Sequence, residues 1–167
     1  MIRFNLDPGR PLTPGERALV AGVFGQSLDA EPVRIHRAKW FWFQPRNVAM
    51  APDGHIWFHP DGGLWRADFS EAPAHLQAFL VHELTHVWQH QHGLCLLIRR
   101  HPFCRYSYRI EPGRRLLDYG IEQQAMIVEH LFTGFLAGKP DQMIAQLVRD
   151  AGLNGLAGLG PTNITDQ

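Results

Sequence analysis

The sequence predicts a single α+β domain. Its 167 residues match the usual length of one domain, and the 45% of hydrophobic residues are enough to form a buried core. Residues typical of strands gather in the first third of the chain, whereas the helical period of apolar residues dominates the middle. No internal repeat or linker divides the chain. We expect a core of about residues 13–150 within one domain spanning 1–167, and a flexible glycine-rich tail at 151–167.

The first predicted element is a short amphipathic helix at Arg17–Phe24. Thr13 is a suitable N-cap residue, and Pro14 suits the first helical position. Glu16 stands where it can complete a capping box with Thr13. Gly25 is available to end the helix.

The next region predicts a small sheet. Residues 33–36 alternate between apolar and polar, and 40–43 are four aromatic residues of the kind that favours strands. These aromatics are more typical of a core strand than of a substrate groove. Residues 48–50 and 55–58 predict a hairpin, because 51–54 form a turn sequence rich in Pro, Asp and Gly.

A long helix is predicted from Ser70, a suitable N-cap, to about His92, with Gly93 as its terminator. Apolar residues cover most of the circumference of this helix, so we expect it to be buried in the middle of the domain. They are Leu76, Phe79, Leu80, Val81, Leu84, Val87 and Trp88. Polar residues on such a helix need a specific reason to be there.

Three further elements are predicted downstream. Residues 105–110 have the pattern of a short strand, and a second long helix covers about Tyr119–Leu136. Asp141 is a suitable cap for a last helix that reaches about Arg149.

Composition argues against several classes of protein. Sixteen basic residues balance sixteen acidic ones, which disfavours bulk electrostatic binding to nucleic acid or an anionic membrane. The sequence has no apolar run of membrane-spanning length and no secretory signal, so we expect a cytoplasmic protein, with export by a signal-independent route left open. Cys95 and Cys104 are too few for a disulfide framework, and we expect free thiols.

The chemically informative residues are His82-Glu83-Leu84-Thr85-His86. Histidines four positions apart lie on one face of a helix, so both imidazoles can reach one ion, and Zn²⁺ accepts such nitrogen ligands. Glu83 points about 100° away around the axis, where it can act as a base toward a water molecule. The pattern, on a helix that is predicted to be buried, indicates a zinc-dependent hydrolase rather than a structural cluster.

The third metal ligand is predicted to be Glu122, at the start of the second long helix. His92 has the offset of a longer zinc motif, but that motif needs a glycine where this chain has Gln89, and an unbroken helix turns His92 away. His90 lies a further turn from the ion. Glu129 is about 10 Å along the helix from Glu122, so it suits a supporting role rather than ligation.

At this point the residues resemble the gluzincin branch of the zincin-like zinc metallopeptidases. The wider pattern of residues 33–36, 53–60 and 80–89 resembles the DUF4157 type of bacterial metallopeptidase domain. Residues 101–106 and 119–125 are similar to a small group described as Vgr-related proteins, whose relatives occur beside secretion-system spike and toxin proteins.

The resemblance implies a zincin-like fold, in which a small twisted sheet packs on the helix that carries the two histidines. It also implies zinc ligation by His82, His86 and Glu122, with Glu83 as the catalytic acid and base. A familiar gluzincin pattern has an aspartate four residues after the ligand glutamate, and Met126 stands there in this chain. We therefore expect residues other than an aspartate at this position to hydrogen-bond and orient the ligand histidines.

The sequence thus predicts a metallopeptidase that cleaves a peptide or protein substrate with Zn²⁺ as cofactor. A hydrolase also needs a donor for the developing oxyanion, and Tyr119 is the first candidate. Other candidates are Arg105, Tyr106, Tyr108 and His130. The alternative function is a non-catalytic interaction module on a zincin scaffold, with a secretion-system or toxin protein as its partner.

Overall fold

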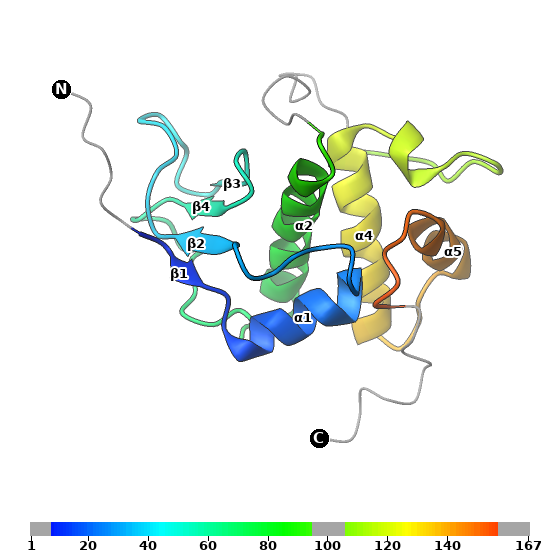
Figure 1. The fold of residues 1–167 in the computed structure, drawn as a ribbon, viewed down its shortest axis with the longest axis horizontal. Coiled ribbons are helices and arrows are strands. Elements are labelled where there is room, and N and C mark those ends of the chain that lie inside the picture. Colours follow the sequence, from blue (N-terminus) through cyan, green and yellow to red (C-terminus); the bar gives the residue numbers. More distant parts are fainter. Residues whose placement is uncertain (1–7, 95–105, 157–167) are drawn as a thin grey trace.

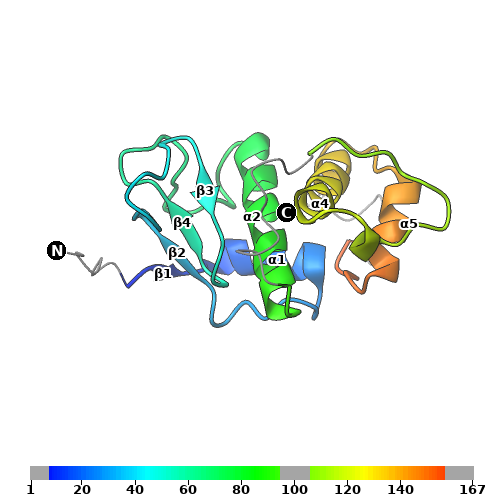
Figure 2. The same ribbon diagram turned by 90° about the horizontal axis from the view of Figure 1, so that it is seen from above.

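The computed structural model describes residues 8–94 and 106–156. These residues form an α+β arrangement in three layers (Figures 1 and 2). A small sheet lies on one side of helix α2 (Ala74–Gln91), and helix α4 (Ile121–Leu136) lies beside α2 on the other side. Helix α5 (Gln142–Asp150) packs outside α4, and α1 (Pro14–Phe24) crosses one end of α2. Helix α2 is therefore the central element of the core.

The sheet has four short strands in the order β1-β2-β4-β3. They are β1 (Arg10–Pro11), β2 (Arg34–His36), β3 (Ala49–Met50) and β4 (Ile56–Phe58). Strands β3 and β4 form the predicted antiparallel hairpin, while β2 pairs with β4 in parallel. Strand β3 is consequently at an edge of the sheet, and it is the strand that contributes Ala49 to the pocket described below.

The predicted capping box of α1 is confirmed. The Thr13 hydroxyl accepts a hydrogen bond from the Glu16 amide at 3.1 Å, and Glu16 Oε2 accepts one from the Thr13 amide at 2.9 Å. Gly25, with φ 59°, follows the last helical residue as predicted.

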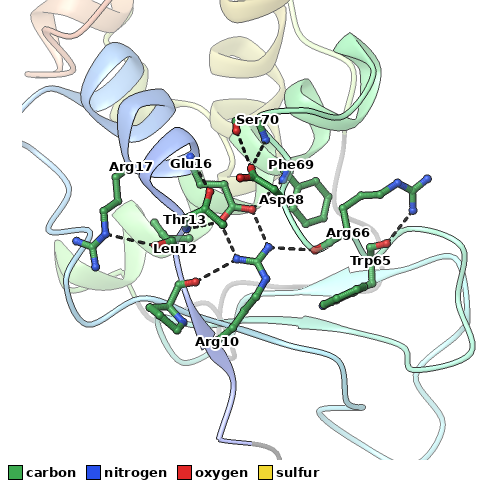
Figure 3. Close-up of polar contacts among 11 residues, drawn as sticks. Arg10, Leu12, Thr13, Glu16, Arg17, Trp65, Arg66, Asp68, Phe69 and Ser70 are labelled. Carbon is green, nitrogen blue, oxygen red and sulfur yellow. Dashed lines mark hydrogen bonds and ion pairs between the residues drawn. The ribbon is translucent and has the colours of Figure 1, made fainter.

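Glu16 also has a role that the sequence did not indicate (Figure 3). Its carboxylate is fully buried and accepts two hydrogen bonds from the Arg10 guanidinium, each 2.7 Å long, and one from the Phe69 amide at 2.9 Å. Arg10 Nη2 donates further to the Arg66 carbonyl at 3.0 Å. One ion pair with a fully buried carboxylate thereby joins β1, α1 and the segment that leads into α2.

Helix α2 begins later than predicted. Pro73 occupies the N-cap position and its carbonyl accepts hydrogen bonds from Leu76 and Gln77, whereas the Ser70 hydroxyl donates to Asp68 Oδ1 at 2.6 Å. Proline can precede a helix because it lacks the amide hydrogen that would need a partner there. The prediction of Ser70 as the cap was therefore wrong, whereas Gly93, with φ 78°, follows the helix end as predicted.

The second long helix and the last helix are confirmed, with α4 starting two residues later than expected. A turn of 3₁₀-helix, η1 (Leu116–Asp118), precedes α4, and the Asp141 carboxylate caps α5 through the amides of Met143 and Ile144. Residues 106–110 are not in a strand; here the carbonyls of Ser107 and Arg109 accept hydrogen bonds from side chains next to and within α4. Arg105 lies outside the described residues.

Two further expectations need correction. The aromatic residues 40–43 form a turn rather than a core strand, and Trp42 is 83% exposed. Their preference for strands is overridden because the Gln44 side chain bonds the backbone at Trp40, Val48 and Trp57 and closes a loop. The start of the supposed flexible tail is also packed, since Leu153 and Leu156 are buried. Within residues 8–94 and 106–156, no helix is long and apolar enough to cross a membrane.

Candidate metal centre

Helix α2 presents His82 and His86 on one face, one turn apart. Their ring centroids are 5.0 Å apart and nearly perpendicular, and both residues are buried, at 8% and 2% exposure. The i, i+4 spacing places both rings on the same stripe of the helix. Two imidazoles in an apolar core need polar partners, and α4 supplies them.

Glu122 lies in the first turn of α4 and reaches both rings. Its Oε2 is 3.4 Å from His82 Nε2 and 3.3 Å from His86 Nε2. One ligand atom from each of the three residues lies within 4.8 Å of the others. Two atoms bound at about 2.05 Å to a tetrahedral Zn²⁺ are separated by about 3.3 Å. The three residues are therefore close enough to share one metal ion.

The hydrogen bonds of His86 define which of its nitrogens can bind a metal. Gln89 Nε2 donates to the Ile121 carbonyl and to Gln124 Oε1, each at 2.9 Å. The Gln89 oxygen must then face His86 Nδ1, 2.8 Å away, and an amide oxygen can only accept. His86 Nδ1 is thus the protonated nitrogen. Its Nε2, which makes no hydrogen bond to a described residue, presents a lone pair to the site.

His82 is oriented by a carboxylate from the same neighbouring helix. His82 Nδ1 donates to Glu129 Oε2 at 2.9 Å, which leaves Nε2 facing Glu122. Burial lowers the pKa of His82, but the hydrogen bonds to Glu122 and Glu129 and the charge of Glu83 outweigh burial and raise it to about 10. Without a metal the ring therefore holds a second proton, which a cation at Nε2 would displace.

Glu83 is placed beside the three candidate ligands without being one of them. It is 3% exposed, and its Oε2 makes no hydrogen bond to a described residue. Glu83, His82 and Glu122 line one pocket of about 270 Å³. The other lining residues are Asn47, Val48, Ala49, Phe79, Tyr106, Met126 and Glu129. A buried carboxylate with an open hydrogen-bonding position at such a pocket is suited to act on a bound water molecule.

Tyr119 is separate from this group. Its hydroxyl donates to the Arg109 carbonyl and accepts from the Glu111 amide, both at 3.1 Å, and the Arg114 guanidinium covers its ring. The structure gives Tyr119 the role of fixing the chain before α4, instead of the predicted role as an oxyanion donor. Among the other candidates, Tyr106 lines the pocket.

Among the residues that the structure describes, no other histidine joins the three candidate ligands. His90 is exposed, and His92 packs on Trp88 with its Nδ1 2.9 Å from the Trp88 carbonyl. His92 was predicted to turn away from the ion and His90 to lie a further turn along the helix, and neither belongs to the candidate ligand group among the described residues. Cys95 and Cys104 lie outside the described residues.

Gln89 and Gln124 support the candidate centre through hydrogen bonds and were not predicted from the sequence. The only available signal was the position of Gln89, three residues after His86 and therefore on nearly the same face of the helix. Its link to Gln124 depends on how α2 and α4 pack, and no local pattern contains that information. Glu129 has the supporting role that its position indicated.

These features define an α+β domain with a two-histidine, one-glutamate candidate metal centre at a pocket. No family model matches the chain. An alignment over 137 residues, which covers 77% of the chain, is 42% identical to the type VI secretion system spike protein VgrG2b of Pseudomonas aeruginosa, and the match spans 13% of that protein.

A solved structure provides the more complete comparison. The effector domain of Pseudomonas aeruginosa VgrG2b superposes with a TM-score of 0.72 and 37% identity, over 87% of this chain and 83% of that domain. The chain therefore belongs to the family of the VgrG2b effector domain. The predicted relation to Vgr proteins is confirmed.

Proposed function

We propose that this domain is a zinc-dependent metallopeptidase with a zincin-like fold, in which His82, His86 and Glu122 hold the metal and Glu83 is the general base. The observation that carries the proposal is the convergence of the two Nε2 atoms and Glu122 Oε2 in buried positions beside an open pocket. The support that Glu129 and Gln89 give to the outer nitrogens is the kind that metal-binding histidines use.

A bound zinc ion would supply Lewis acidity toward a water molecule and the substrate carbonyl. Glu83, with an oxygen free of hydrogen bonds to described residues, accepts the proton of the attacking water and returns it to the leaving amine. Phe79 and Met126 add an apolar lining to the pocket beside these polar groups. Tyr106 is the pocket residue of a type that can donate a hydrogen bond to the oxyanion.

The similarity to a spike protein supports a second part of the proposal. The relative is named as a type VI secretion system spike protein, and the solved domain as its effector domain. We propose that this chain works with such a secretion system, as an effector module that acts on a peptide or protein substrate. The same names are compatible with a module that binds the secretion machinery and has no catalytic activity.

Hydrolysis of a peptide library by the purified chain tests the catalytic proposal. We expect cleavage that stops with a chelator and returns with zinc. Glu83→Gln should keep stoichiometric zinc and lose about 10²–10⁴-fold in turnover, because it removes only the base. Glu71→Gln, which neutralises an exposed glutamate ahead of α2, is the matched control and should cleave normally. Zinc binding by a wild-type chain that cleaves no peptide would favour the non-catalytic module.

A further inference from the structure

Residues 37–47, which make up most of the connection between β2 and β3, display two aromatic side chains to solvent; we call this segment the aromatic loop. Trp42 is 83% exposed and Phe43 is 61% exposed. The loop projects from the sheet side of the molecule, away from α4 and α5 (Figures 1 and 2). Single exposed apolar side chains are common, but two large aromatic rings side by side at the tip of one loop form a candidate contact surface.

The tip of this loop is held in place by the rest of the domain. Gln44 is 3% exposed, and its side chain accepts a hydrogen bond from the Trp40 amide at 2.8 Å. It also donates to the Val48 and Trp57 carbonyls at 2.9 and 3.0 Å. The ring of Phe43 stacks on Phe41 with centroids 4.5 Å apart. The two exposed rings are therefore held by a fixed turn. The loop loses its conformational entropy when the domain folds, so binding does not have to order it again.

The charge of the aromatic loop differs from that of the whole chain. The loop contains Arg37, Lys39 and Arg46 and no acidic residue, whereas the chain as a whole has a formal net charge of zero. All three basic residues are exposed. The loop thus combines apolar rings at its tip with cations on both flanks.

We propose that the aromatic loop binds to an anionic lipid surface, with Trp42 and Phe43 entering the interface between headgroups and acyl chains. Tryptophan is enriched at that depth, and each nearby Lys or Arg strengthens attraction to anionic lipid about fivefold. A protein partner is a poorer match, because a stable protein interface covers about 800 Å² on each side and this tip exposes only two large rings. The balanced total charge excludes bulk attraction, but not this local contact.

Binding through this loop would bring the candidate metal centre to the lipid surface. Asn47, the last residue of the loop, and Val48, the next one, both line the pocket beside Glu83. The chain would then act on, or be held beside, molecules at a membrane. The lipid contact does not depend on hydrolysis, so it can fail or succeed independently of the proposed peptidase activity.

Flotation of the purified full chain with lipid vesicles tests this proposal. The anionic vesicles contain equimolar phosphatidylglycerol and phosphatidylcholine, the neutral vesicles contain phosphatidylcholine alone, and both are used at low salt. The chain should float with the anionic vesicles and at least about tenfold less with the neutral ones. Trp42→Ser with Phe43→Ser should reduce the bound fraction about tenfold or more, and Arg46→Gln about fivefold.

Met143→Ser is the matched control, because Met143 is 61% exposed on α5, far from the loop, and this variant should bind like the wild type. Circular dichroism melts verify folding of every variant. Binding that is equal in the wild type and the Trp42→Ser/Phe43→Ser variant would overturn the proposal. Absence of binding to any of the vesicles would overturn it as well. If the chain binds no vesicle but is retained by an immobilised acidic polypeptide, the aromatic loop is assigned to a protein partner instead.

Discussion

Gln89→Ala tests whether the packing of α2 against α4 prepares the candidate metal centre. The substitution removes the acceptor of His86 Nδ1 and the donor to both the Ile121 carbonyl and Gln124 Oε1. Each buried polar group that loses its partner costs about 1–3 kcal/mol, so three such groups should lower the free energy of unfolding by at least about 3 kcal/mol. Loss of the support of a ligand histidine should also weaken zinc binding about 10–100-fold.

Urea unfolding of the metal-free chain and competition for zinc against a chelator of known affinity measure the two effects separately. Gln89→Glu keeps an acceptor for His86 but loses both donated hydrogen bonds, so it should destabilise the fold while retaining most of the zinc affinity. Gln91→Ala is the control: Gln91 is an exposed residue of the same helix that bonds only to the Asp29 backbone in the described residues. Zinc affinity unchanged in Gln89→Ala would refute the argument that Gln89 orients His86.

Two further predictions concern the Arg10–Glu16 ion pair and the tyrosines. Glu16→Ala leaves the Arg10 guanidinium without its buried partner, so it should lower the free energy of unfolding by about 3 kcal/mol, or Tm by about 6–12 °C. Arg17→Ala is the control: it breaks an exposed ion pair and should cost less than about 1 kcal/mol. Equal thermal shifts for the two variants would contradict this assignment. Tyr106→Phe should lower peptide turnover about tenfold or more with zinc content unchanged, while Tyr119→Phe should change thermal stability only. Slower turnover in Tyr119→Phe at full stability would restore Tyr119 as the candidate donor.

Local patterns in the sequence predicted the features that depend on neighbours along the chain. The caps at Thr13 and Asp141 were predicted correctly because a capping hydrogen bond spans only two or three residues. The hairpin of β3 and β4 was also predicted correctly, because a turn sequence separates its two short strands. The start of α2 was missed because Ser70 and Pro73 are both acceptable near a helix start, and only the hydrogen bonds distinguish them.

The aromatic loop shows the opposite case. Its four consecutive aromatic residues favour a strand by propensity, yet Gln44, which follows them, bonds to the backbone on both sides and closes a turn. A polar side chain that is buried in this way changes the local structure through contacts with residues up to 13 positions away. Intrinsic preference for strands is too weak to oppose such tertiary contacts.

The sequence by itself determined that His82 and His86 share one face of a buried helix with Glu83 beside them, because four residues make about one helical turn. It also indicated Glu122 as a partner from a later helix. Only the tertiary structure decided that Glu122 Oε2 lies at 3.3–3.4 Å from both rings and that Gln89 and Glu129 hold their outer nitrogens. The physical reason is that such distances depend on the relative rotation and separation of α2 and α4. These are set by the packing of many side chains across the core rather than by any local run of residues.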